Sequence, residues 1–276
     1  MTTWTQRYLK LLDLEPPPAL PDLDWLRRFG AAHLDAVSFC NVTAIQRRFE
    51  ADGDAVPPVD HEAQLRAWEQ RTGGGVCFEV AEMVSKLLGE MGYDVHLVLG
   101  QITFPASHQA VVVRLREGPY MVDLGCGAPL AEPIPLISTS EYHVAGLGYR
   151  FRPDLASMTC VQDRLIDGEW SEFCPYDLRP ADPETREVGY QRHHIPGETW
   201  VIGSITLVRY LNGDVLALRD GRFTRYGADT SKQTLEVVSD AALERHVVED
   251  LGWPELPVAN AIQSLRTLRS RASTAD

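Results

Sequence analysis

A run of three glycines that leads into a single cysteine constrains this chain more than any other feature. Gly73, Gly74 and Gly75 are followed by Val76 and Cys77. Directly after the cysteine, apolar residues recur with the spacing of one buried helix face. These apolar residues are Val80, Met83, Val84, Leu87 and Leu88.

This spacing places Cys77 where a glycine turn becomes the first turn of a helix. Unpaired N–H groups and the positive end of the helix dipole lie at that point. They stabilise a thiolate relative to a thiol, and the thiolate is the nucleophilic form. The stretch by itself fits a buried structural cysteine equally well.

The composition is that of a globular chain and limits its partners. The 276 residues carry a formal net charge of -13, so we expect no nucleic-acid partner, because an acidic surface repels phosphate backbones. The five cysteines form no C-x-x-C pair, which argues against a disulfide framework or a zinc ribbon. With no recognisable signal peptide and no apolar run long enough to span a bilayer, we expect a soluble, cytoplasmic protein without a resident metal.

The periodicity of the chain divides it into helical and β-rich parts. Residues 1–92 are predicted to be mostly helical, with Cys77 on the last helix. After Gly92 the pattern changes to alternating or β-branched runs, first over Val95–Ile102 and then over Ala110–Leu115 and Tyr120–Leu124. Asp167-Gly168 and Asn212-Gly213 are typical hairpin turns. Two helices are predicted near the end, from Ser239-Asp240 to Leu251 and over Val258–Leu268.

A cysteine nucleophile needs a base, and His108 is the histidine best placed to act as one. His108 opens the apolar strand after a short loop, where a ligand can reach it. Asp123 interrupts a second apolar strand, where a carboxylate is costly unless it is paired. If Arg116-Glu117 forms the tip of the hairpin, Asp123 lies diagonally across from His108 within reach. A salt bridge from Asp123 to an arginine is the alternative.

Two other histidine positions are weaker candidates. His193 and His194 are adjacent, but no acidic or cysteine ligand pattern surrounds them, so a surface loop is the favoured interpretation. His96 alternates within a strand and is either packed or exposed.

The motifs together resemble the arylamine N-acetyltransferase family. Gly-Gly-x-Cys-Phe-Glu at a helix start is followed by a histidine that opens a strand and then by Tyr-x-Val-Asp-x-Gly-x-Gly. Phe39-Cys40-Asn41 and the segment from Pro196-Gly197 to Val208 extend the similarity over most of the chain. The resemblance implies a triad of Cys77, His108 and Asp123.

The resemblance also implies an α+β fold with a core like that of a cysteine protease. We expect an N-terminal helical bundle over residues 1–92, a central antiparallel β-barrel over 93–204 and a C-terminal α/β lid over 205–276. The implied reaction is ping-pong transfer of an acyl group from acetyl-CoA or another acyl-coenzyme A to an arylamine, hydrazine or N-hydroxyarylamine. Gly203 and Ser204 are weak candidates for residues that line the coenzyme A cleft.

Three positions depart from the family pattern. Gly73 stands where the family has an arginine, and the arginine here is Arg71, two residues earlier. Ala81 replaces a frequent asparagine, and Cys40 replaces the glutamate of a Phe-Glu-Asn segment. Three other functions remain open: an amide synthase of the same superfamily that uses a carrier-bound acyl chain, a cysteine hydrolase, and a binding protein that has kept the triad.

Overall fold

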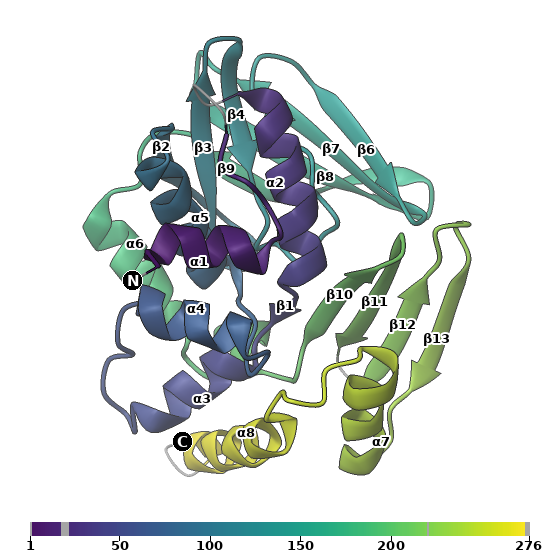
Figure 1. Ribbon diagram of the computed structural model, residues 1–276. Coiled ribbons are helices and arrows are strands. Elements are labelled where there is room, and N and C mark those ends of the chain that lie inside the picture. Colours follow the sequence, from purple (N-terminus) through teal and green to yellow (C-terminus); the bar gives the residue numbers. More distant parts are fainter. Residues whose placement is uncertain (1, 18–21, 220, 274–276) are drawn as a thin grey trace.

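The first part of the chain forms a helical bundle, as predicted. The computed structural model describes residues 2–17, 22–219 and 221–273, and Figure 1 shows its elements. Side-chain caps set several helix starts, because an N-cap oxygen accepts an otherwise unpaired N–H. Asp22 accepts from the Trp25 amide and Asp60 accepts from the Ala63 amide. The helices are α1 (Trp4–Leu11), α2 (Leu23–Ala36), α3 (Val42–Glu50), α4 (His61–Glu69) and α5 (Cys77–Glu90).

An antiparallel sheet of eight strands follows the bundle and curls into the predicted barrel. Its edges are β5 and β6, and the neighbours in between run β4, β3, β2, β9, β8 and β7. The strands are β2 (Asp94–Gly100), β3 (His108–Leu115), β4 (Gly118–Val122), β5 (Ile134–Pro135), β6 (Ser140–Val144), β7 (Leu147–Asp154), β8 (Thr159–Ile166) and β9 (Glu169–Asp177).

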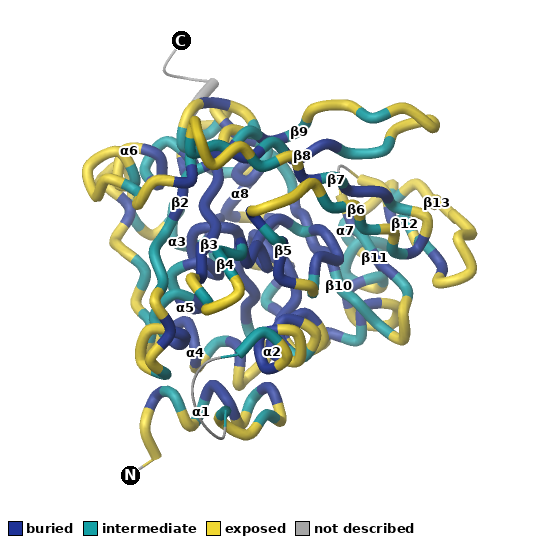
Figure 2. Tube along the Cα trace, turned by 90° about the horizontal axis from the view of Figure 1, so that it is seen from above, coloured by how far each residue is buried: buried dark blue, intermediate teal, exposed yellow. Residues whose placement is uncertain are grey.

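Strand β3 is buried on both faces, which explains its nearly continuous apolar sequence. Val111 and Val113 pack against the helical bundle, whereas Ala110 and Val112 belong to the barrel interior. Figure 2 shows the same strand within the buried middle of the molecule, with exposed segments toward the rim. His108 shares the even-numbered face, so its side chain lies at the end of the barrel interior.

The C-terminal part forms a second antiparallel sheet with helices beside it. One of its two edge strands, β1 (Phe39–Cys40), comes from the N-terminal part and pairs with β10 (Leu207–Leu211). Helix α8 lies along α3 (Figure 1), and the apolar residues of both helices join the core beneath this sheet. The division at residues 92 and 204 stays a prediction. The remaining elements here are β10 (Leu207–Leu211), β11 (Asp214–Arg219), β12 (Arg222–Tyr226), β13 (Lys232–Glu236), α7 (Asp240–Arg245), the π-helical turn η2 (His246–Asp250) and α8 (Val258–Ser273).

The prediction of a surface loop around His193 and His194 is wrong. Residues 183–193 form helix α6 (Pro183–His193), followed by the 3-10 turn η1 (Trp200–Ile202), and both histidines are buried. Apolar periodicity does not reveal α6, because the helix is held largely by polar contacts. Asp182, which caps it by accepting from the Thr185 amide, and Pro183 at its first position were the available signals.

Among the described residues, no helix combines the length and the apolar character needed to cross a lipid bilayer.

Candidate active site

The glycine run lets the backbone before Cys77 pack against β1. A side chain on Gly74 would put its Cβ 2.4 Å from the Cβ of Cys40 and 2.5 Å from the Ser38 carbonyl oxygen. The Cys40 amide donates to the Gly75 carbonyl at 3.1 Å, which ties the turn to the strand. Cys77 is then the first residue of α5, as the sequence predicts.

Gly125 brings the segment after β4, which carries Asp123, against the cysteine. A Cβ at Gly125 would lie 2.7 Å from the Cα of Cys77, so only a glycine permits this approach. Cys77 is buried at 5% exposure, and the Gly125 backbone covers the start of its helix. The close contact fixes Cys77 relative to the end of β4.

The His108–Asp123 pair predicted from the hairpin register is present. Leu115 pairs with Gly118, so Arg116-Glu117 forms the tip that the prediction assumed. The His108 Nε2 atom lies 2.8 Å from Asp123 Oδ2, and both side chains are almost fully buried. Burial opposes a charge on His108, but the Asp123 carboxylate and the Cys77 sulfur outweigh it and raise the pKa of His108 well above its usual value. Since Nε2 faces Asp123, Nδ1 is the ring nitrogen left for Cys77.

Tyr176 is a functional candidate that sequence reasoning missed. Its hydroxyl donates to Asp123 Oδ2 at 2.7 Å and lies 3.2 Å from Gln162 Oε1. Gly100 pairs with His108 on one side and with Tyr176 on the other. A Cβ at Gly100 would lie 3.1 Å from the Tyr176 ring, so this glycine allows the ring to sit 5.7 Å from the His108 ring. A glycine at the end of an apolar strand was the one available signal.

A buried ion pair helps to hold the glycine turn before Cys77 in place. Arg47 Nη1 lies 2.5 Å from Glu79 Oε1, and Glu79 Oε2 accepts from the Val76 amide at 3.1 Å. Gln64 accepts from Arg47 and donates to the Gly74 carbonyl at 2.7 Å. One network therefore holds both the glycine turn and the first turn of α5.

The positions that depart from the family pattern have structural roles here. Arg71 donates to the Gly252 carbonyl and lies 3.9 Å from Glu255, so it holds the C-terminal part rather than the turn. Burial raises the pKa of the Cys40 thiol to about 12, which keeps it protonated. Ala81 is buried within α5.

A small cavity of about 20 Å³ lies against the cysteine. Its walls are mainly apolar and aromatic and come from the N-terminal part, the barrel region and the segment from α6 to η1. Phe39, Val76, Cys77, Ile102, Thr103, Ser107, Gly125, Cys126, His193, Thr199, Trp200 and Val201 line it.

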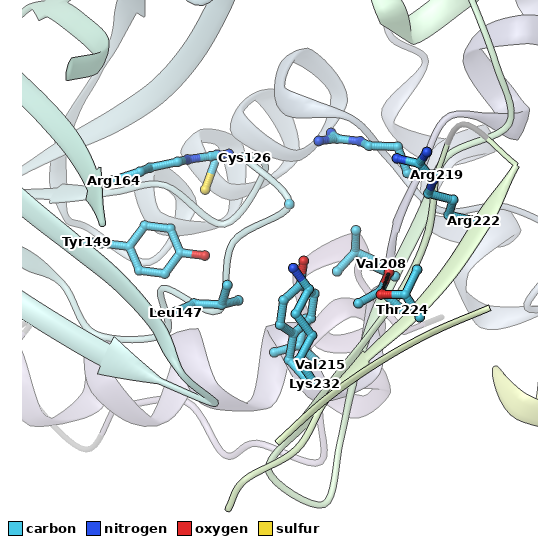
Figure 3. Close-up of a pocket in the computed structure, with 14 residues that line it drawn as sticks. Cys126, Leu147, Tyr149, Arg164, Val208, Val215, Arg219, Arg222, Thr224 and Lys232 are labelled. Atoms are coloured by element: carbon cyan, nitrogen blue, oxygen red, sulfur yellow. Dashed lines mark hydrogen bonds between the residues drawn. The ribbon is translucent and has the colours of Figure 1, made fainter. Parts of the chain in front are cut away.

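A larger cavity of about 340 Å³ lies between the barrel and the C-terminal sheet, and Cys126 lines both cavities. Figure 3 shows Tyr149 and Arg164 on the barrel side, facing Arg219 and Arg222 across the space. Lys232 also lines it, and no acidic side chain does so among the described residues. The Nε of Arg164 is buried without a hydrogen-bond partner in the described residues. In a chain of net charge -13, such a cavity favours anions.

The remaining candidates lie apart from the Cys77 cavity. His96 on β2 bonds through Nε2 with the Leu178 carbonyl at 3.1 Å. The carbonyl of Gly203 accepts from Arg269, and the carbonyl of Ser204 accepts from Asn41 at 2.6 Å, so both residues help to fix the turn after η1. Their contact with coenzyme A stays a prediction. In the described part of the chain, no group of three or more His, Cys, Asp or Glu side chains is arranged to hold a metal.

Comparisons with known proteins agree with the resemblance seen in the sequence. A family model described as N-acetyltransferase matches residues 22–254. An arylamine N-acetyltransferase of Mycolicibacterium smegmatis is 27% identical over 84% of this chain and 88% of its own length. An arylamine N-acetyltransferase / N-hydroxyarylamine O-acetyltransferase of Salmonella typhimurium is 24% identical over 93% of this chain and 85% of its own.

Solved structures share the fold at lower identity. The Salmonella typhimurium arylamine N-acetyltransferase superposes with a TM-score of 0.76 at 20% identity, covering 92% of both chains. The Mycobacterium marinum arylamine N-acetyltransferase in complex with CoA also gives 0.76 at 20% identity, over 95% of this chain and 96% of that one. The chain is therefore a divergent member of the arylamine N-acetyltransferase family, a family of acyltransferases.

Proposed function

We propose that this protein transfers an acyl group from a coenzyme A thioester, acetyl-CoA first among them, to an arylamine, hydrazine or N-hydroxyarylamine. The observation that carries the proposal is the buried cluster in which His108 interacts with both Cys77 and Asp123 at the start of α5. The names of the relatives and the CoA complex of one of them support the substrate classes.

In the first half-reaction, the Cys77 thiolate attacks the thioester carbonyl. A new C–S bond forms to Cys77, the C–S bond to coenzyme A breaks, and the departing thiolate takes the proton of the His108 imidazolium. Asp123 holds the imidazole ring and stabilises its charge. The N–H groups of Cys77 and Phe78, the first two of α5, receive no partner within the helix and are candidates to bind the developing oxyanion.

In the second half-reaction, the amine attacks the acyl-cysteine. The C–N bond forms, the C–S bond breaks, and Cys77 leaves as a thiolate while His108 takes the proton from the amine. An arylamine suits this step, because it is largely neutral near pH 7 whereas an alkylamine is protonated. Since Cys77 is acylated before the amine reacts, the kinetics are expected to be ping-pong.

The cationic cavity is the proposed site for the phosphates of coenzyme A. It adjoins the Cys77 cavity at Cys126, and the side chains of Arg164, Arg222 and Lys232 face into one space. Arginine and lysine are the usual partners of phosphate, because they form charge-assisted hydrogen bonds with its oxygens.

The function is tested by mass spectrometry of the intact protein after incubation with acetyl-CoA and longer acyl-CoA thioesters. We expect a single acyl adduct on Cys77 that 4-methoxyaniline removes as the amide. No adduct from any thioester would refute the acyltransferase proposal, whereas loading only from a carrier-bound acyl chain would favour an amide synthase. Discharge by water alone would favour a hydrolase.

Cys77→Ala is the matched variant for this test. The change removes one sulfur atom from a small cavity, so we expect an unchanged melting temperature together with complete loss of the adduct and of turnover. Cys126→Ala changes the neighbouring cysteine of the same cavity and should retain the adduct. Turnover by Cys77→Ala would show that the nucleophile is another residue.

A further inference from the structure

A second histidine lies beside the proposed nucleophile, and the mechanism above does not use it. His193 is the last residue of α6 and lines the same small cavity as Cys77. Its ring lies 5.2 Å from the Phe78 ring. His193 is also close enough to His108 for the positive charge on His108 to lower the pKa of His193. Only 4% of the residue is exposed.

Packing contacts hold helix α6, and with it His193, in a fixed position. A Cβ on Gly189 would lie 2.3 Å from the Ala106 carbonyl oxygen, so the helix rests directly on the loop before His108. At the next residue, the Tyr190 hydroxyl donates to the Pro57 carbonyl at 2.8 Å, and the Tyr190 ring packs on the Phe78 ring with 5.6 Å between the ring centres. These contacts clamp α6 to the start of α5 just before His193.

The two ring nitrogens of His193 are buried and poorly satisfied by hydrogen bonds. The Ser107 backbone lies close to the ring and acts to raise its pKa, but neither Nδ1 nor Nε2 makes a hydrogen bond of normal geometry in the described part of the chain, although a buried polar group without a partner is costly. Burial, together with the nearby His194 and His108, holds the pKa of His193 well below its usual value, so the ring is neutral at pH 7. A neutral imidazole always offers one donor and one acceptor nitrogen.

The adjacent histidine provides a comparison. His194, the residue after the end of α6, bonds through Nδ1 with the Tyr190 carbonyl at 2.8 Å, and its ring packs 4.6 Å from the Tyr190 ring. It is not among the residues that line the Cys77 cavity. Of the two neighbouring buried histidines, His194 is thus bonded to the helix through Nδ1, although its Nε2 has no partner among the described residues, and His193 faces the nucleophile without a hydrogen bond of normal geometry at either nitrogen.

We propose that His193 binds the acceptor amine, accepting a hydrogen bond from its N–H so that the nitrogen lone pair points at the acyl-cysteine. The aromatic side chains of Phe39 and Trp200, whose rings lie 5.8 Å apart, belong to the same cavity wall and would flank an aryl group, which enters only if this wall moves outward, because the cavity measures about 20 Å³. This inference rests on the proposed function and assigns the acceptor side of it to a named residue. His108 still receives the proton; His193 binds and orients, and no net transfer to it is required.

The test uses His193→Leu, which removes both ring nitrogens and keeps the volume similar. Because those atoms make no hydrogen bond of normal geometry among the described residues, we expect a melting temperature equal to or above that of the wild type. In ping-pong kinetics, kcat/KM for 4-methoxyaniline should fall by about tenfold, as for the loss of one hydrogen bond, while kcat/KM for acetyl-CoA stays within about twofold. His193→Gln, which places an amide in the cavity as a substitute hydrogen-bonding group, should recover part of the amine rate.

His194→Leu is the matched control, and it should lower the melting temperature without changing the ratio of the two kcat/KM values. Equal losses in both half-reactions for His193→Leu, or no loss in the amine step, would overturn the proposal. If the wild type forms no acyl adduct, the proposed function is refuted, and this result says nothing about the role of His193. Calorimetric binding of 4-methoxyaniline to the unmodified protein then decides the role of His193, because the Leu variant should weaken it by about tenfold.

Discussion

Asp123 accepts hydrogen bonds from two side chains at one oxygen atom, and this limits how strongly its charge acts on His108. The Tyr176 hydroxyl shares Oδ2 with the imidazole at 2.7 Å, against 2.8 Å for His108. A hydroxyl has one proton to give, and a carboxylate attracts it more strongly than an amide oxygen does. We therefore expect Tyr176 to act as a positioning residue that moderates the proposed triad.

The change Tyr176→Phe tests this moderation. Without the hydroxyl, more of the Asp123 charge faces His108, the pKa of His108 rises further, and the imidazolium returns its proton to the coenzyme A thiolate more slowly. We expect the rate of Cys77 acylation to fall by about tenfold, with the ionisation in its pH profile moved upward. Tyr93→Phe, whose hydroxyl bonds with the Asp22 carbonyl in the bundle, is the control. An unchanged pH profile in Tyr176→Phe would contradict the assignment.

At the scale of elements, hairpins and amphipathic segments were predictable because their signals are local. The turn at Arg116-Glu117 fixed the pairing of β3 with β4, and that register put His108 and Asp123 within reach of each other. Asp167-Gly168 and Asn212-Gly213 likewise join the predicted pairs of strands. A turn specifies register by residue count alone, so no distant contact is needed.

Contacts between distant elements were not predictable in the same way. Helix α6 has little apolar periodicity, and its place on α5 depends on Gly189, Tyr190 and the loop at Ala106. Tyr176 reaches Asp123 only because Gly100 lies between two strands that are far apart in sequence. The site residues that sequence reasoning missed, Tyr176 and His193, both depend on such packing.

The cavity between the two sheets gives a prediction at this scale. Lys232→Ala on β13 removes one cation from the cavity, whereas Arg225→Ala on β12 removes one from an exposed pair with Asp214 outside it. We expect Lys232→Ala to raise KM for acetyl-CoA by roughly tenfold, as for one charge-assisted contact, and Arg225→Ala to leave it unchanged. The acetyl thioester of N-acetylcysteamine, which has no phosphate, should react equally with both variants. An equal effect on both thioesters would place the phosphates elsewhere.

At the scale of the whole molecule, buried histidines set how stability depends on pH. Burial lowers the pKa of His33 to about 3, and His193 and His194 are also held below their usual pKa. For these three, the unfolded chain binds protons that the folded chain excludes, so their stabilising contribution is complete above pH 6.5 and is lost as the pH falls. His108 has the opposite sign, because its folded pKa is raised: its contribution is complete below pH 6.5 and is lost as the pH rises.

The free energy of unfolding should therefore be greatest near pH 6.5 and fall on both sides. Each buried neutral histidine adds a slope of up to about 1.4 kcal/mol per pH unit below that value, so three give at most about 4 kcal/mol per unit. Urea unfolding followed by tryptophan fluorescence at several pH values measures this slope. His193→Leu should reduce the acid slope by about one proton, and His108→Gln should flatten the decline just above pH 6.5 without changing the acid side. A flat profile between pH 5 and pH 6.5 would mean that these histidines bind protons in the folded protein, and His193 would then be a cation rather than a hydrogen-bond acceptor for the amine.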